Sequence, residues 1–444
     1  MIPYLRSYNR FLLSLSPQRN LVYGFLVYNT IGFLLLCLPW FHNGDNQWID
    51  NLFASTSAIS TTGLLTVGTT EYFTTLGQMV LMLLFQIGGI GYMTFTTYIL
   101  LSSTHKASNW RKKVMNAAFS IPDSLDLKDF IKSAVVFTIS MEILGVILFY
   151  IGFMDEGWGF WETLWHSIFH SISAFCTAGF SLFGNGFEDF VGNGMINFAA
   201  SLLAIGGSLG FIVFTDLWLW IKNKKHSISF TTRVIFIGFA VLLTFGTLNL
   251  YFNEPAIMAL EGATRFYAAF FQSMSAMTTV GFNTIPINSL ILPSLFAIIF
   301  LMYVGASPSG TSGGLKITTF TTVIAYLRSK LKACDGILFF GRRIPQKRVD
   351  IALTSFIFYI TIIFFGLLLL TNSENIEFRD IMFETLSALG TVGLSTGVTG
   401  ELTFFGKCVI IALMFIGRLG VITFGLALSR TSVEEDTEEE DIAV

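Results

Sequence analysis

Four short segments of the chain carry a threonine and a glycine at the same spacing, inside one shared template. The template is F-x-[ST]-x-S-A-x-x-T-x-G-[FL], and its four copies align without a gap. The copies are residues 53–64 (FASTSAISTTGL), 169–180 (FHSISAFCTAGF), 271–282 (FQSMSAMTTVGF) and 383–394 (FETLSALGTVGL). A single T-x-G is uninformative, whereas four copies that share the Ser-Ala, Thr and Gly columns indicate an internal repeat.

The residue types of this template can bind a cation through backbone oxygens. Residues 53–60 make about two helical turns, roughly 12 Å, so the segment can only enter a membrane partway and must turn back. The T-x-G that follows can run extended, and glycine permits backbone angles at which successive carbonyl oxygens face one axis. Four such strands would form a ring of oxygens that replaces the hydration shell of a monovalent cation. Each short helix would also direct its negative C-terminal dipole to that point.

The candidate cation-binding residues are therefore the three that end in the template glycine of each copy. They are Thr61, Thr62, Gly63, Thr177, Ala178, Gly179, Thr279, Val280, Gly281, Thr391, Val392 and Gly393.

The composition places these segments in a polytopic membrane protein. Of 444 residues, 53% are hydrophobic and only 12% are charged, whereas charged residues make up about a quarter of soluble domains. Apolar runs long enough to cross a bilayer occur at 21–41, 76–101, 134–154, 195–221, 234–252, 351–371 and 408–429, and an eighth run from residue 289 is interrupted after residue 304. We expect an all-α fold of four tandem helix, pore-loop, helix repeats with eight transmembrane helices around a central pore.

The repeats divide the chain. A second glycine column, Gly88, Gly206, Gly305 and Gly417, follows the template glycines by about 25 residues, within the next helix. The predicted segments are a cytoplasmic start at 1–19, repeat 1 at 20–103, a cytoplasmic loop at 104–132, repeat 2 at 133–221, a loop at 222–233, repeat 3 at 234–327 with an intramembrane loop at 305–316, a loop at 328–348, repeat 4 at 349–430 and an acidic tail at 431–444.

Charge predicts the orientation. Lysine and arginine collect in every second loop, which by the positive-inside rule places both termini in the cytoplasm. The outer segments instead hold fifteen carboxylates: Asp45, Asp50, Glu71, Asp155, Glu156, Glu162, Glu188, Asp189, Glu254, Glu261, Glu374, Glu377, Asp380, Glu384 and Glu401. An acidic outer face would concentrate cations. The alternative, simple avoidance of basic residues outside, explains the missing positive charges but not the carboxylates.

Other chemistries find little support. Cys37, Cys176, Cys334 and Cys408 show no CxxC spacing and are predicted to be free thiols. His166 and His170 are interpreted as pore-helix polar residues instead of a metal site. No cluster of nucleophile, base and metal ligands suggests an enzyme. An alternating-access symporter would show inverted repeats, whereas these four copies share one topology.

The stretch at 303–320 (YVGASPSGTSGGLKITTF) interrupts the inner helix of the third repeat. Its backbone must be satisfied by water or protein, so we expect a loop in the cytoplasmic half of the pore, whereas the other three inner helices are expected to pass this point as helices. A helix kink that serves packing alone is the alternative. The candidate gate residues are Gly305, Ala306, Ser307, Pro308, Ser309, Gly310, Thr311, Ser312, Gly313, Gly314, Lys316 and Arg418.

Arg418 is expected at mid-membrane depth, where an unpartnered charge costs at least about 2.5 to 3.5 kcal/mol. We expect loop carbonyls between Gly305 and Gly314 to accept its hydrogen bonds, with pairing to Glu142 or Asp216 as the alternative. Glu142 itself faces either a dimer interface or Arg418. Lys316 is predicted to extend to the inner membrane surface.

These features together resemble the Trk, Ktr and HKT cation transporters, a family related to potassium channels, over nearly the whole chain. The chain is most similar to Ktr-type membrane subunits, because it starts at the first repeat. The resemblance implies potassium uptake across the plasma membrane, a homodimer with one pore per subunit in the lipid bilayer, and a cytosolic ring of nucleotide-binding RCK subunits. It implies no nucleic-acid partner and no cofactor in this chain; K⁺ at the filter is the only implied metal ion, and activation by Na⁺ stays open.

The resemblance also carries expectations for the sites. The 305–316 loop is similar to the intramembrane gating loop of the family. The filter keeps only the first glycine of the potassium-channel TVGYG, which implies fewer ion sites and looser selectivity. Glycine at all four positions favours potassium, and a sodium-permeable or sodium-coupled member of the same family is the alternative.

Overall fold

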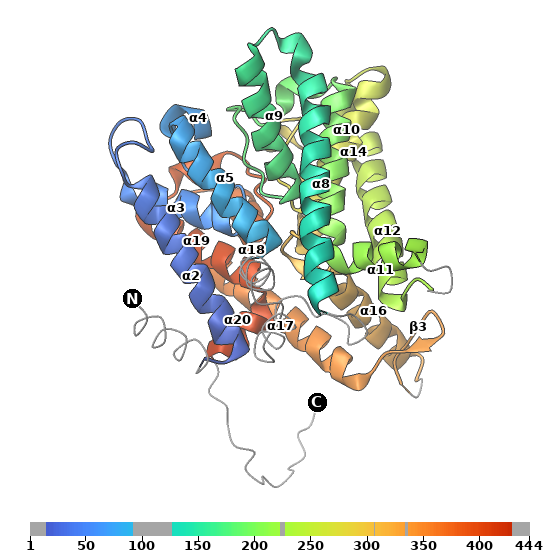
Figure 1. Ribbon diagram of the computed structural model, residues 1–444. Coiled ribbons are helices and arrows are strands. Elements are labelled where there is room, and N and C mark those ends of the chain that lie inside the picture. Colours follow the sequence, from blue (N-terminus) through green and yellow to red (C-terminus); the bar gives the residue numbers. More distant parts are fainter. Residues whose placement is uncertain (1–14, 92–126, 223–226, 306, 334–335, 429–444) are drawn as a thin grey trace.

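The computed structural model describes residues 15–91, 127–222, 227–305, 307–333 and 336–428, and these form an all-helical protein (Figure 1). The strands within these residues are two pairs of two residues each: parallel β1 (Val304–Gly305) with β2 (Leu315–Lys316), and antiparallel β3 (Leu338–Phe339) with β4 (Arg342–Arg343). The short helices α4 (Thr69–Tyr72) and α13 (Pro255–Met258) and four 3₁₀ turns lie in the connections. The predicted N-terminal segment up to residue 14, most of the 104–132 loop and nearly all of the acidic tail fall outside the described residues.

Each repeat begins with a long outer helix. These helices are α2 (Pro17–Leu36), α8 (Leu127–Phe153), α12 (Phe230–Asn253) and α17 (Gln346–Ser373). All four are long and apolar enough to cross a membrane. Large apolar side chains such as Ile143 and Phe364 are exposed on them, which is the surface that lipid tails solvate.

A short pore helix follows each outer helix and ends one or two residues before the template threonine. The four are α3 (Trp48–Ile59), α9 (Phe160–Phe175), α14 (Gly262–Thr278) and α18 (Phe378–Gly390). The first template residue of each copy is a phenylalanine with 0% exposure: Phe53, Phe169, Phe271 and Phe383. The template therefore repeats partly because each pore helix is anchored by the same buried ring.

The described inner helices end partway instead of passing straight through. They are α5 (Thr75–Ile90), α10 (Gly194–Leu209), α15 (Leu292–Tyr303) and α19 (Phe404–Leu419), of which α10, α15 and α19 resume after the break as α11 (Phe211–Lys222), α16 (Ile317–Leu331) and α20 (Val421–Leu428). The bend is 91° between α10 and α11 and 100° between α19 and α20. Glycines with positive φ stand at the ends of α5, α10 and α19, namely Gly91 (83°), Gly210 (83°) and Gly420 (81°).

The expectation that only the third repeat interrupts its inner helix was therefore wrong. A left-handed glycine stops the helix in the other repeats too. By length and composition, four described helices can span a membrane, or six if each bent pair counts as one span. Of the eight predicted spans, the other two begin with the shorter apolar helices α5 and α15: α15 is interrupted by the predicted loop, and α5 is followed by residues outside the described ranges.

The inner-helix glycines let the helix touch a carbonyl in the last turn of the pore helix. A Cβ atom added to Gly88 would lie 2.1 Å from the oxygen of Ile59, and one added to Gly417 would lie 2.1 Å from that of Leu389. In repeat 2 the residue with this role is Gly207, 1.9 Å from the Phe175 oxygen. The predicted column named Gly206, one residue too early.

The four repeats close into a cycle. Helix α5 packs against α8 and α9, α10 against α14, and α15 against α18. The first and last repeats then meet, because α3 packs against α19 and α2 against α20, as the blue and red elements of Figure 1 show. A partly buried ion pair joins them, with Lys407 Nζ 2.7 Å from the buried Asp50 Oδ1.

Gly207 and its neighbour Gly206 provide a matched pair of substitutions. We expect Gly207→Ala to destabilise the folded protein by about 1–3 kcal/mol or more, because the new methyl group overlaps a backbone oxygen that cannot move freely. Gly206→Ala should change stability little, since its Cβ would meet only the flexible end of Met141, at 3.0 Å. Thermal unfolding of both variants in detergent measures the difference. Equal melting temperatures would show that the inner helix does not depend on this close approach.

Candidate functional site

The threonine and glycine of each T-x-G share one unusual backbone conformation. Every template threonine and every template glycine has positive φ: Thr61 (53°), Gly63 (92°), Thr177 (49°), Gly179 (70°), Thr279 (58°), Gly281 (79°), Thr391 (51°) and Gly393 (90°). Positive φ costs a β-branched residue of order 1–3 kcal/mol. Its occurrence four times at one template position shows that the surrounding structure enforces this conformation.

The four template glycines form a closed ring. A Cβ atom added to each would collide with the carbonyl oxygen of the residue before the next repeat's glycine. The contacts run from Gly63 to Ala178 (2.6 Å), from Gly179 to Val280 (2.7 Å), from Gly281 to Val392 (2.1 Å) and from Gly393 to Thr62 (2.1 Å). The ring order is therefore repeat 1, 2, 3, 4 and back to 1, and only glycine fits at these positions.

The second serine of the template holds each strand in place. Its carbonyl oxygen accepts the backbone N–H of the residue before the template glycine, at 2.9 Å for Ser57, 2.8 Å for Ser173, 3.1 Å for Ser275 and 2.9 Å for Ser387. The hydroxyls of Ser57 and Ser387 accept the glycine N–H, at 3.0 and 3.1 Å. Those of Ser173 and Ser275 instead donate to the carbonyl oxygen after the glycine, at 2.8 and 2.5 Å. Sequence reasoning noted this column but assigned it no role.

The 305–316 loop lies directly against the threonines of the ring. The carbonyl oxygen of Thr311 is 3.4 Å from Thr61 Oγ1, and the hydroxyl of Thr311 is 3.1 Å from that of Thr177. A Cβ atom added to Gly313 would lie 2.1 Å from Thr391 Oγ1. The loop thus touches three of the four repeats beneath the ring.

The loop is tied to the break in the second repeat's inner helix. Thr311 N–H donates to Gly207 O at 3.1 Å, and Ser307 N–H donates to Ser208 O at 3.2 Å. In return, Phe211 N–H donates to Ser309 O at 3.2 Å. The interrupted backbones of α10–α11 and of the loop therefore satisfy each other, as irregular backbone at membrane depth requires. Pro308 and Gly310 pack here too, since their backbone atoms lie 2.7 and 2.8 Å from a Cβ atom added to Gly210.

The loop's two ends are pinned together. Gly305 pairs with Lys316 in the parallel β1–β2 bridge, and Gly314 (φ 70°) lies against Gly305. Lys316 Nζ donates to Ser312 O at 2.6 Å and to Gly313 O at 3.0 Å. The prediction that Lys316 reaches the membrane surface was wrong, because its ammonium group donates hydrogen bonds to carbonyl oxygens of its own loop. Ala306 lies outside the described residues.

Arg418 joins three repeats. Its guanidinium donates to the carbonyl oxygens of Thr311 and Gly88, and to that of Gly89 at 3.2 Å. The expected contact with a loop carbonyl is present. Glu142 has a partner that neither expectation named, since Gln86 Nε2 donates to its carboxylate at 2.7 Å. Asp216 accepts the backbone N–H of Ser229 at 2.9 Å.

Not all of the outer carboxylates face water. Glu188 is half-buried, and five others are buried: Asp50, Glu254, Glu374, Asp380 and Glu384. Glu374, for example, accepts hydrogen bonds from Thr403 N–H at 2.9 Å and from Thr403 Oγ1 at 2.6 Å, beside the start of α19. The other nine are exposed. The prediction of an acidic outer face therefore holds for fewer charges than the sequence suggested.

The predicted thiols and histidines have no part in the ring. Cys37, Cys176 and Cys408 are free thiols, and Cys334 lies outside the described residues. His170 is buried in pore helix α9 with its Nδ1 at 2.8 Å from the carbonyl oxygen of His166. Among the described residues, no group of three His, Cys, Asp or Glu side chains could hold a metal ion.

The chain matches the TrkH family, described as cation transport proteins, over residues 20–436. The chain belongs to the TrkH family. It is 35% identical over 426 residues to the Ktr system potassium uptake protein B of Bacillus subtilis (strain 168), a match that covers 94% of both chains. It is 34% identical to the protein of the same name from Vibrio alginolyticus, over 89% of this chain and 88% of the relative.

The TrkH membership also extends to the fold. The crystal structure of the potassium transporter TrkH from Vibrio parahaemolyticus matches with a TM-score of 0.72 at 20% identity, covering 92% of this chain and 84% of that one. The family resemblance and the all-helical membrane fold inferred from sequence are confirmed. Membership of a cation-transport family identifies the chain as a transporter and not an enzyme.

Proposed function

We propose that this protein takes up potassium across the plasma membrane, through a pore whose selectivity filter is the ring of Gly63, Gly179, Gly281 and Gly393. The observation that carries the proposal is the closed contact of each glycine with the next repeat's carbonyl. The Bacillus subtilis and Vibrio alginolyticus relatives are named potassium uptake proteins. The twelve residues from Thr61–Gly63, Thr177–Gly179, Thr279–Gly281 and Thr391–Gly393 are the potassium-binding residues of this proposal.

The ring selects a cation through oxygen dipoles. Backbone carbonyls replace water around a dehydrated ion, and four pore helices end at the ring with the negative ends of their dipoles. Single-glycine strands offer fewer coordination sites than a potassium-channel filter. We propose that the basic loops and both termini lie in the cytoplasm, because the positive-inside rule favours that orientation.

A second candidate is a transporter that also conducts or is coupled to sodium. The chain is 33% identical over 424 residues, 93% of both chains, to a protein of Enterococcus hirae named potassium/sodium uptake protein NtpJ. Uptake into cells that lack other potassium transporters, with K⁺ or Na⁺ as the sole transported cation, separates the two. Uptake of K⁺ without Na⁺ supports the potassium proposal, and comparable uptake of both supports the alternative.

The ring itself can be tested with serine. Gly281→Ser and Gly63→Ser should lower the ratio of K⁺ to Na⁺ uptake by at least about tenfold, which corresponds to 1.4 kcal/mol, because the side chain strains the backbone and displaces a coordinating carbonyl. Gly262→Ser is the matched control, because Gly262 also has positive φ (56°) but no heavy atom within 4 Å of an added Cβ. An unchanged ratio in both ring variants would remove the filter assignment.

We also propose that residues 305–316 with Arg418 gate this pore. The loop contacts the threonines of the ring, and its two ends are joined only by the two-residue β1–β2 pairing. Its hydrogen bonds go to carbonyls and N–H groups of neighbouring repeats, which other groups or water could satisfy if the loop moved aside. Arg418 is the charged group that fastens the loop to repeats 1 and 4.

Loosening this gate should increase transport. Charge-assisted hydrogen bonds contribute about 1.5–3 kcal/mol, and 1.4 kcal/mol is tenfold in an equilibrium, so Arg418→Ala or deletion of residues 307–312 should raise K⁺ uptake per folded dimer several-fold or more. Arg379→Ala is the control, since Arg379 pairs with Glu377 and Asp380 beside it in the sequence, at the opposite end of pore helix α18 from the loop. If both gate variants fold and dimerise normally but transport less than wild type, the loop serves packing and not gating.

We further propose that the protein is a homodimer and docks on a cytosolic ring of RCK-type nucleotide-binding subunits. Two relatives, one from Bacillus subtilis and one from Vibrio alginolyticus, are named as proteins of a Ktr system. The β3–β4 hairpin presents Arg342 and Arg343 as exposed side chains between repeats 3 and 4. Of the other predicted docking loops, Lys222 is exposed, while residues 111–113 and 223–225 lie outside the described residues.

Charge reversal tests this docking. Arg343→Glu, with Arg342→Glu, should weaken binding of an RCK-type protein from the same genome to the purified dimer, because a positive surface that attracts an acidic partner becomes negative. Arg265→Glu, on the opposite side of the predicted topology, should leave binding unchanged. Binding can be measured by size-exclusion chromatography of the mixed components. The absence of any complex with the wild-type dimer would contradict the docking proposal.

A further inference from the structure

One template position differs among the four repeats in a way that the filter does not explain. The residue directly after the buried phenylalanine is Ala54, His170, Gln272 or Glu384, and each is at most 1% exposed. It lies on the pore helix, and in repeats 2 and 4 it contacts the exit strand, which is the segment after the filter glycine (residues 180–183 in repeat 2 and 394–399 in repeat 4). A buried polar side chain needs hydrogen-bond partners. The partners of this residue therefore show in which repeats the pore helix is bonded to the exit strand.

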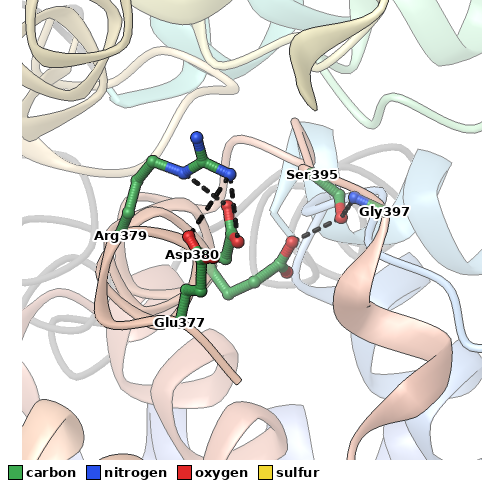
Figure 2. A network of polar contacts seen from close by, with 6 residues as sticks. Glu377, Arg379, Asp380, Ser395 and Gly397 are labelled. Carbon is green, nitrogen blue, oxygen red and sulfur yellow. Dashed lines mark hydrogen bonds and ion pairs between the residues drawn. The ribbon is translucent and has the colours of Figure 1, made fainter. Parts of the chain in front are cut away.

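In repeat 4 this residue holds the exit strand through two hydroxyl groups. Glu384 accepts a hydrogen bond from Ser395 Oγ and another from Thr399 Oγ1, the latter at 2.9 Å. Ser395 in turn accepts the backbone N–H of Gly397 at 2.9 Å. Figure 2 shows Ser395 beside Gly397 in this network. It also shows the ion pairs of Arg379 with Glu377 and Asp380 at the start of the pore helix.

Repeat 2 uses different residues in the same geometry. His170 Nδ1 lies 2.8 Å from the carbonyl oxygen of His166, so Nδ1 carries the proton and Nε2 is the acceptor. Nε2 accepts Leu182 N–H at 3.2 Å and lies 3.3 Å from Ser181 Oγ. Ser181 accepts the N–H of Phe183 at 3.0 Å. In both repeats the bonded serine stands two residues after the filter glycine and caps the N–H two residues further on.

Repeats 1 and 3 lack this arrangement. Ala54 and Leu65, which occupy the two positions in repeat 1, have no side-chain polar atom. In repeat 3, neither amide atom of the buried Gln272 has a hydrogen-bond partner among the described residues. Asn283, at the serine position, instead donates to Glu188 of repeat 2 at 2.7 Å. Because the ring order is 1, 2, 3, 4, the two repeats that have the arrangement lie opposite each other across the pore.

We propose that Glu384 with Ser395, and His170 with Ser181, are two latches that fix the exit strands of opposite repeats and thereby determine how well the filter distinguishes potassium from sodium. The proposal rests on the potassium function proposed above. Glu384 and His170 are positioning residues, because they act on the ion only through the strand. A ring whose strands are held at two opposite points cannot contract freely around a smaller cation. The selectivity then depends on two of the four repeats, although all four contribute a glycine to the ring.

The test compares the two halves of the repeat-4 latch. Glu384→Ala and Ser395→Ala should each lower the ratio of K⁺ to Na⁺ uptake roughly two- to tenfold, the range expected for one hydrogen bond. The double variant should lower the ratio by less than the two single effects combined, because both changes remove the same Glu384–Ser395 hydrogen bond, while only the Thr399 and Gly397 contacts are lost separately. Glu384→Gln should restore most of the ratio, since its amide accepts from one hydroxyl and donates to the other. Thermal unfolding in detergent checks that each variant is folded. If Glu384→Ala does not fold, the uptake ratio of Ser395→Ala decides the test.

Gln272→Met is the matched control in an unlatched repeat. It replaces the two unpartnered amide atoms with an apolar chain of similar length and should keep the wild-type ratio. The latch proposal is overturned if Glu384→Ala and Ser395→Ala keep the wild-type ratio, or if Gln272→Met lowers it equally. If Gly281→Ser lowers the ratio in the same assay while the latch variants do not, the latch is wrong and the filter stands. If the wild type takes up neither ion, the proposed function fails and the latch fails with it.

Discussion

The contact between each template glycine and the carbonyl oxygen of the next repeat is the constraint on which the rest of this structure depends. Four backbones can meet around one axis only where no side chain intervenes and where φ is positive at alternate residues. The pore helices must then end at a fixed height, which the buried template phenylalanines maintain. The inner helices must also come close enough to touch pore-helix carbonyls, which Gly88, Gly207 and Gly417 permit.

Hydrogen bonding at membrane depth explains why the interruptions of the inner helices occur together. Hydrocarbon offers no partners for a freed N–H or C=O group, so one broken helix is stable only beside another irregular segment. The break after α10 and the loop at 305–316 exchange hydrogen bonds in both directions. Arg418 and Lys316 add charged donors to carbonyls that the broken helices leave free. The same contacts that stabilise the loop also place it under the ring.

The four repeats share a backbone plan but have diverged in their side chains. Within the residues that the structure describes, only the third repeat has the long loop; the fourth supplies the arginine that fastens it, and the second supplies carbonyls that accept its hydrogen bonds. Polar pairs hold the exit strands of repeats 2 and 4, while repeat 1 has apolar residues at those positions and repeat 3 has an unpartnered Gln272 and an Asn283 that bonds to repeat 2. Because the four units are parts of one chain, each can vary independently, which a symmetric tetramer of identical subunits does not allow. The proposed gating and selectivity would therefore depend on single residues while the ring keeps its four-fold backbone.

The sequence alone determined the membrane class, the four-fold repeat, the residues of the ring and the family, because these follow from local patterns: apolar run length, a recurring template and glycine where a side chain cannot fit. It also predicted the loop and the contact of Arg418 with it. The tertiary structure decided which glycine of the pair at 206 and 207 faces the pore helix, because a one-residue shift on a helix turns the side chain by about 100°. It decided that three further inner-helix segments end at left-handed glycines, which apolar composition cannot reveal. It also decided the partners of Glu142 and Asp50, because Gln86 and Lys407 lie 56 and 357 residues away in the chain and come near only when the four repeats close around one axis. Lys316 instead finds its partners within its own loop, which depends on how that loop folds back.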